Sequence, residues 1–95
     1  MPRFVWDPEK GRRNLAKHGV AFEDAVLVFA DPLHIVLEDR VQDGEERWHA
    51  IGRARGVILL LVVHTYPDAG REEVIRIISA RKATPNERKR YEAGP

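Results

Sequence analysis

The sequence contains no cysteine, and its longest uninterrupted apolar run, residues 57–63, is short. The first absence excludes disulfides, thiolate metal sites and thiol nucleophiles. The second excludes a membrane-spanning helix within the sequence, because a bilayer requires roughly 20 apolar residues. Residues 1–7 also lack the apolar stretch of a secretory signal. We therefore expect a cytoplasmic protein that does not associate with membranes.

Several signatures of catalysis are missing as well. We find no Gly-rich phosphate loop, no serine–histidine–acid pattern and no pair of catalytic carboxylates. The histidines His34, His49 and His64 lack the close spacing and the carboxylate partner that a metal site requires. We expect neither a metal ion nor another cofactor.

The length of 95 residues fits one domain spanning residues 1–95. The formal net charge is only +1, but the charges are separated along the chain. Residues 1–20 carry five Lys/Arg and two Asp/Glu. Residues 21–50 carry two Lys/Arg and eight Asp/Glu, and residues 51–95 carry nine Lys/Arg and five Asp/Glu. Such segregation can produce a polyanion-binding face, although mixed surface charge also serves solubility alone.

The first third of the chain predicts a short strand followed by two helices. Residues 4–6 form an apolar run, and Asp7 with Pro8 is a typical helix start. Gly19 is placed to end that helix. The second helix carries an apolar stripe at the spacing i, i+3, i+4, i+7, and this stripe must face a core. Its members are Phe22, Ala25, Val26 and Phe29.

The remaining chain predicts four strands and a final helix. Alternating or apolar stretches at residues 33–38, 46–53, 57–66 and 73–81 are separated by polar turns at 40–45, 54–56 and 67–70. Thr84, Pro85 and Glu87 have the spacing of a capping box at a helix start. The order β-α-α-β-β-β-β-α predicts an α+β fold, with two helices on one face of an antiparallel sheet and a short C-terminal helix.

Cationic side chains are predicted to gather on the other, open sheet face. Alternation places Arg47, His49 and Arg53 on one face of their strand, and His64 and Tyr66 together on one face of the next. Arg76 interrupts an isoleucine-rich strand, where burying a guanidinium would be costly, so we expect it on the open face beside His64 and Arg53. Further polar side chains frame the sheet edge from the C-terminal end: Arg81, Lys82, Arg88, Lys89, Arg90 and Tyr91.

This groove suits phosphates and unstacked bases, but each member also has a structural interpretation. Arg47 and Arg53 could simply solvate the sheet and pair with Glu38 or Glu46. The two histidines, His49 and His64, could be hydrogen-bonded sheet residues without a chemical role. The residue pattern alone does not choose between these alternatives.

Beyond this pattern, the sequence resembles the BrnT family over nearly its whole length. The N-terminal part of the resemblance comprises residues 4–8, Asn14, residues 17–20, 22–25 and 28–32. The middle part comprises residues 46–48, 51–52 and 62–65, and the most specific block is residues 75–84 with 87–88 and 91–92. One departure is Ala21, where a serine or threonine is common and would cap the second helix.

The resemblance implies a RelE-like fold and a ribonuclease toxin that cleaves RNA without metal. Within that frame we assign His64, Arg76 and Arg81 to catalysis. RNA contacts are expected from a further set: Arg47, His49, Arg53, Ser79 and Tyr91. The expected partners are RNA and a ribbon-helix-helix antitoxin, with operator DNA bound only through that antitoxin. Homodimer formation stays open.

Two other classes of function are compatible with the same sequence. The first is a non-catalytic binding module or co-repressor, whose basic face only docks an acidic antitoxin segment. The second is a regulator that contacts DNA itself. Purified protein would leave RNA intact in the first case and would bind an operator without a partner in the second.

Overall fold

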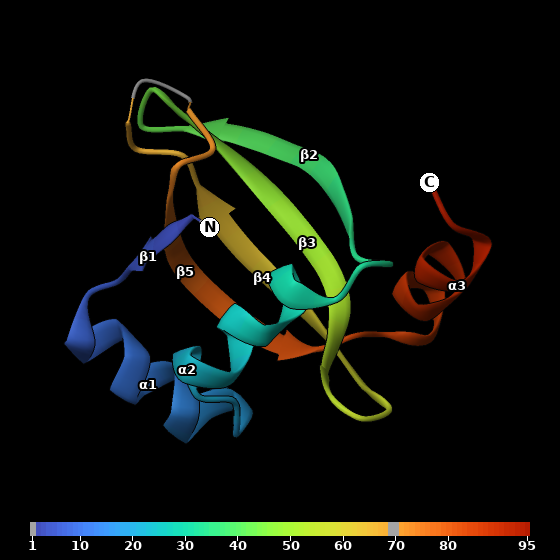
Figure 1. The fold of residues 1–95 in the computed structure, drawn as a ribbon. Helices are drawn as coiled ribbons and strands as arrows, with labels where there is room; N and C mark the ends of the chain where they lie inside the picture. Colours follow the sequence, from blue (N-terminus) through green and yellow to red (C-terminus); the bar gives the residue numbers. More distant parts are fainter. Residues whose placement is uncertain (1, 69–70) are drawn as a thin grey trace.

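Five strands form a single sheet in the order β1-β5-β4-β3-β2 in the computed structural model, which describes residues 2–68 and 71–95 (Figure 1). The strands are β1 Arg3–Val5, β2 Ile35–Gln42, β3 Glu45–Arg55, β4 Ile58–Thr65 and β5 Val74–Lys82. The helices are α1 Pro8–His18, α2 Phe22–Ala25 and α3 Pro85–Ala93, with a 3-10 helix η1 at Val26–Ala30. The predicted α+β order is confirmed.

Strand directions follow the prediction, with one refinement at the sheet edge. β2, β3, β4 and β5 pair antiparallel, whereas β1 pairs in parallel with β5. β1 and β5 lie far apart in the sequence, so no tight turn forces them to run in opposite directions. The sheet is therefore mixed.

The predicted helix ends are present. Asp7 accepts a hydrogen bond from the Glu9 amide at 2.8 Å, and Gly19 adopts a left-handed conformation with φ of 71°. Thr84 and Glu87 form the reciprocal capping box. The second helix is shorter than its apolar stripe suggested, because the chain tightens into η1 after Ala25.

The turns are narrower than the polar stretches that predicted them. β2 continues to Gln42, so the β2–β3 connection consists of Asp43 and Gly44. Both residues have positive φ, 54° and 75°, as a tight two-residue hairpin requires. Pro67 and Asp68 lie in a turn after β4, and the rest of that predicted turn, residues 69 and 70, lies outside the described residues.

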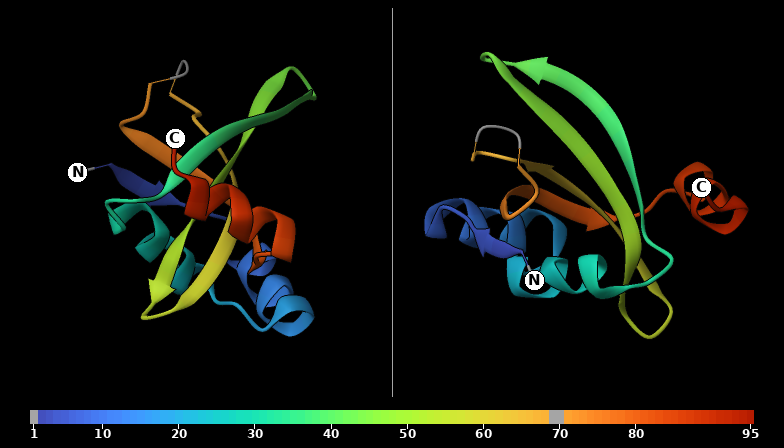
Figure 2. Two further views of the ribbon diagram at one scale, coloured as in Figure 1. Left: turned by 90° about the vertical axis from the view of Figure 1, so that its right-hand side faces the viewer. Right: turned by 45° about the horizontal axis from the view of Figure 1, so that its top comes forward.

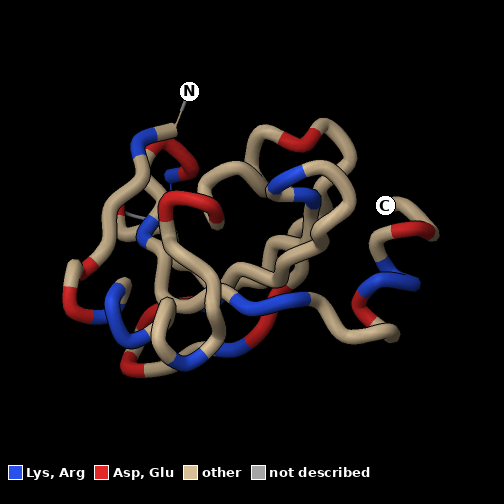
Figure 3. The backbone as a smooth tube through the Cα atoms, turned by 90° about the horizontal axis from the view of Figure 1, so that it is seen from below, with Lys and Arg blue, Asp and Glu red and all other residues tan. Residues whose placement is uncertain are grey.

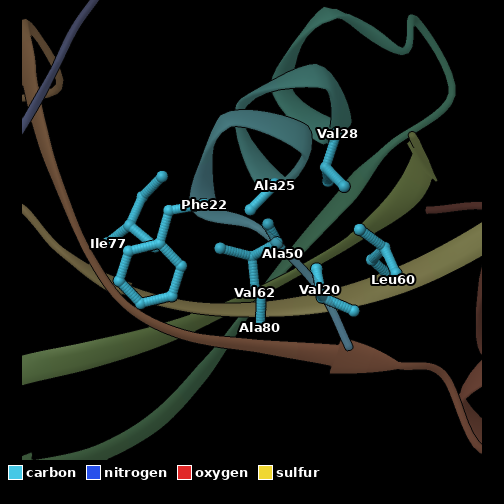
Figure 4. Close-up of a cluster of buried hydrophobic side chains, with 9 residues drawn as sticks. All are labelled: Val20, Phe22, Ala25, Val28, Ala50, Leu60, Val62, Ile77 and Ala80. Carbon is cyan, nitrogen blue, oxygen red and sulfur yellow. The ribbon is translucent and has the colours of Figure 1, made fainter. Parts of the chain in front are cut away.

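The main core lies between one sheet face and the N-terminal helices. Phe22, Ala25 and Val28 pack there against side chains of β3, β4 and β5, among them Val62 and Ile77 (Figure 4). A smaller cluster on the opposite sheet face contains Ile35, Ile51, Leu59, Leu61 and Tyr91 of α3. The sheet thus separates α1 and α2 from α3 (Figures 1 and 2).

Asn14 joins α1 to the edge of β5 that faces away from β4, beyond the last residue paired with β1. Its side-chain amide donates to the carbonyls of Ala80 and Val20, both at 2.8 Å, and accepts from the Ala80 amide at 3.1 Å. A buried amide thereby satisfies strand groups that would otherwise need another strand. This contact fixes α1 against β5.

Candidate active site on the arginine face

The sheet face turned away from α1 and α2 carries the arginines, as predicted for Arg47, Arg53 and Arg76. Strand register assigns side chains to this face, because His49 pairs with Val63, Val63 with Ser79, and Leu61 with Arg81. We call it the arginine face and define it by six residues: Arg47, His49, Arg53, Arg76, Ser79 and Arg81. The structure brings these six predicted site residues onto one surface.

Helix α3 covers one end of the arginine face. Tyr91 is buried against the sheet, and its hydroxyl donates to the Asp31 carboxylate at 2.7 Å. Asp31 also accepts from the backbone amides of Arg53 at 2.8 Å and Leu33 at 2.9 Å. Burial opposes ionisation of Asp31, but these hydrogen bonds outweigh it and lower the pKa of the carboxyl. Tyr91 is among the expected RNA contacts, but its ring is buried between α3 and the sheet and is not exposed for stacking on a base.

Arg81 is held by the first turn of α3. Its guanidinium donates to both carboxylate oxygens of Glu87, at 2.8 and 2.9 Å. The bidentate contact with Arg81 is the largest cause that lowers the pKa of Glu87, to about 2. Glu87 therefore fixes the direction of the Arg81 side chain while it caps the helix.

His49 lies beside an acidic partner that the sequence reasoning missed. The bulge in β2 between Glu38 and Arg40 carries Asp39, whose Oδ2 is 3.3 Å from His49 Nε2. The His49 side chain is partly exposed, at 27%. A carboxylate at Nε2 favours the tautomer with its proton there and leaves Nδ1 as the basic nitrogen. An imidazole in this arrangement can accept a proton at Nδ1.

The other end of the arginine face contains an ion pair and two unsatisfied polar atoms. Arg76 pairs with Glu45, which begins β3. Among the described residues, neither Nε of Arg47 nor the hydroxyl of Thr65 has a hydrogen-bond partner, although both atoms are buried. Glu45 belongs to no motif, and Thr65 appears only within the family block 62–65, so only strand pairing could relate either residue to Arg76.

His64 lies on the opposite, helix-covered face, so its expected position beside Arg76 and Arg53 is wrong. Its exposure is 0%, and its ring packs edge-on against Phe29 with centroids 4.9 Å apart. Nε2 lies 3.1 Å from the Tyr66 hydroxyl. Burial lowers the pKa of His64 to about 4. The interpretation as a hydrogen-bonded core histidine fits this geometry.

The register explains this correction. His64 pairs with Trp48 and His49 pairs with Val63, so the two histidines lie on opposite faces of the sheet. The β4–β5 pairing also shifts by one residue between Val63 and His64, so that Thr65 rather than Tyr66 stands opposite Arg76 and Arg76 lies on the face opposite His64. A shift of one residue exchanges the two faces of a strand. His49 is likewise separated by the sheet from His34 and His64. Over residues 2–68 and 71–95, no three histidine, aspartate or glutamate side chains are grouped to hold a metal ion.

The fold and the arginine face together define the class, a small α+β protein with a cationic, histidine-bearing sheet surface bordered by its last helix. The sequence model of the ribonuclease toxin BrnT of type II toxin–antitoxin systems matches residues 6–87. The chain therefore belongs to the BrnT ribonuclease toxin family, whose members act on RNA and have an antitoxin partner.

A solved structure supports this assignment. The chain is similar to the Brucella abortus ribonuclease toxin BrnT, determined at 1.1 Å resolution, with a TM-score of 0.62 and 26% sequence identity. The similarity covers 88% of this chain and 99% of that chain. No curated protein sequence gives a significant match. None of the helices in the described part of the chain is long and apolar enough to cross a membrane.

Proposed function

We propose that this protein is an endoribonuclease that cleaves RNA on the arginine face without a metal ion. The observation that carries the proposal is the His49–Asp39 pair, which lies on the same sheet face as Arg47, Arg76 and Arg81. One surface thus offers a proton acceptor and several guanidinium groups, the components that cleavage by an internal nucleophile requires.

In the proposed reaction, a ribose 2′-oxygen attacks the adjacent phosphorus and the bond to the 5′-oxygen breaks. The products are a 2′,3′-cyclic phosphate and a free 5′-hydroxyl. His49 Nδ1 accepts the 2′-hydroxyl proton while Asp39 holds the ring. A water molecule protonates the leaving 5′-oxygen and regains its proton from His49, which restores the neutral imidazole. Arg76 and Arg81 stabilise the charge that grows on the phosphoryl oxygens. Arg47, Arg53 and Ser79 contact the flanking backbone.

The test is RNA cleavage by purified protein in the presence of EDTA. We expect activity to persist in EDTA, and His49→Ala to reduce the rate by about 10²–10⁴-fold, the usual contribution of general acid–base catalysis. Arg76→Ala should abolish cleavage. Arg55→Ala is the matched control, because Arg55 pairs with Asp24 of α2 at 2.7 Å, outside the arginine face. If both His49→Ala and Arg76→Ala retain full activity, the active site does not lie on the arginine face.

We further propose that the neutralising partner is a ribbon-helix-helix antitoxin that covers the arginine face. Operator DNA is then bound by the complex and not by this chain alone, which a gel-shift assay with and without the antitoxin measures. If wild-type protein leaves RNA intact both with and without ribosomes, the non-catalytic binding module becomes the better description.

A further inference from the structure

The uncovered end of the arginine face contains three polar side chains in one row across three strands. Trp48 of β3 pairs with His64 of β4, so in this antiparallel pair the preceding residue Arg47 stands opposite the following residue Thr65. Thr65 in turn pairs with Arg76 of β5. We propose that these three residues bind one phosphoryl group of the RNA backbone, and that Glu45 occupies this site in the free protein. The proposal rests on the proposed function and adds a binding site to it.

The two unsatisfied atoms are the first support. Thr65 has an exposure of 0%, and its hydroxyl has no hydrogen-bond partner among the described residues. The Nε atom of Arg47 is also buried and also lacks a partner among them. A buried polar atom without a partner destabilises the fold, so its presence needs an explanation. One ligand with several acceptor oxygens would satisfy both atoms at once.

The Arg76–Glu45 ion pair is the second support. Arg76 lies on β5 and Glu45 on β3, so the Arg76 side chain reaches across β4, where Thr65 lies. A carboxylate and a phosphoryl group both accept paired hydrogen bonds from a guanidinium. Glu45 can therefore take the place of a phosphate on Arg76 and must leave when RNA binds.

The exposure of this ion pair permits such an exchange. The side chains of Arg76 and Glu45 are 39% and 36% exposed, so both are reachable from solvent. Glu45 is the first residue of β3, directly after the turn at Asp43 and Gly44. Its side chain can turn away from Arg76 without breaking the central pairs of the sheet. His49 lies one row further along β3, so the bound group adjoins the proposed reacting phosphate, and Arg76 contacts both phosphates in this proposal.

Thermal unfolding of the full chain in inorganic phosphate, against chloride at equal ionic strength, tests the site without RNA cleavage. We expect phosphate to raise Tm of the wild type. Glu45→Gln should respond at about two- to fivefold lower phosphate, since a partly exposed, solvent-screened ion pair is worth at most about 1 kcal/mol. Asp24→Asn is its matched control, because Asp24 also pairs with an arginine, Arg55, but far from the site.

Thr65→Val separates binding from folding. Valine has nearly the shape of threonine and removes a hydroxyl that has no partner, so Tm in chloride should not fall. The response to phosphate should be lost. An unchanged phosphate response in both Thr65→Val and Glu45→Gln would overturn the site.

A 2′-O-methyl RNA oligonucleotide, which keeps the phosphodiesters but cannot be cleaved, identifies the source of the phosphoryl group. We expect Glu45→Gln to tighten its binding and Thr65→Val to weaken it. If only inorganic phosphate responds to these changes, the assignment to RNA is wrong. If phosphate raises Tm and this effect requires Thr65, but the protein cleaves no RNA, the phosphate site is supported and the proposed nuclease activity is refuted.

Discussion

A single histidine shows how burial decides between two roles. The resemblance assigned His64 to catalysis, but its ring packs on Phe29 inside the helix-covered face. Its pKa is about 4 instead of 6.5, chiefly because burial disfavours the charged ring. The unfolded chain therefore binds a proton first as pH falls below 6.5. The contribution of neutral, buried His64 to the free energy of unfolding is fully present above pH 6.5 and is lost as the pH falls through about 4.

The expected result is a loss of about 2 kcal/mol in the free energy of unfolding between pH 7 and pH 5, from the linkage between the two pKa values. Urea unfolding at both pH values measures it. His64→Phe keeps the ring packing on Phe29 and should remove most of this dependence. Glu87 interferes little, because its pKa is lowered to about 2 and its contribution is lost below pH 4.5. An equally steep pH dependence in His64→Phe would contradict the explanation.

At the scale of elements, caps and alternation predicted most of the fold, and pairing decided what they could not. The ends of α1 and α3 follow Asp7, Gly19 and Thr84, because cap chemistry is local. Alternation also placed Arg47, His49 and Arg53 on a common face correctly. It could not relate one strand to the next. The face of His64 relative to His49 follows from the β3–β4 register, and the face of Arg76 follows from the one-residue shift in the β4–β5 pairing.

The same limit hid two carboxylates of the candidate site, Asp39 and Glu45. Asp39 lies beside His49 only because β2 bulges there. Glu45 reaches Arg76 only because β3 and β5 flank the same strand, β4, and their side chains meet across it. These contacts join residues that are distant in sequence or displaced by irregular pairing. Arg76, by contrast, could be found from the sequence, because the cost of a charge in an apolar strand is local information.

The N-terminus of α2 has no side-chain cap. Ala21 occupies the N-cap with φ of −80° and ψ of 144°, and it makes no side-chain hydrogen bond. Ala21→Ser should raise the free energy of unfolding by about 1 kcal/mol, since serine can accept a bond from the first turn. Ala16→Ser, inside α1, is the control and should lower it by about 0.5 kcal/mol through weaker helix propensity. Thermal or urea unfolding compares the two, and equal shifts would refute the capping argument.

The whole molecule carries almost no net charge, so any attraction for RNA must be local. Acidic and basic segments are interspersed over the backbone, with Lys and Arg on α3 and on the chain that enters it (Figure 3). On the arginine face, Arg76 and Arg81 already have carboxylate partners. RNA binding is therefore expected to depend on a few contacts and not on a broad cationic field.

The salt dependence of binding tests this expectation. In the proposed arrangement three phosphates are neutralised, the reacting one by Arg81 with Arg76, its neighbour by Arg47, and a further one by Arg53. The slope of log K against log salt for single-stranded RNA should then be about −2.1, at about −0.7 per phosphate. Fluorescence anisotropy with uncleavable 2′-O-methyl RNA measures the slope. The variant R88A/K89A/R90A removes the cations of α3 and should leave the slope unchanged. A slope twice as steep that falls in this variant would show that RNA lies along α3 and not on the arginine face.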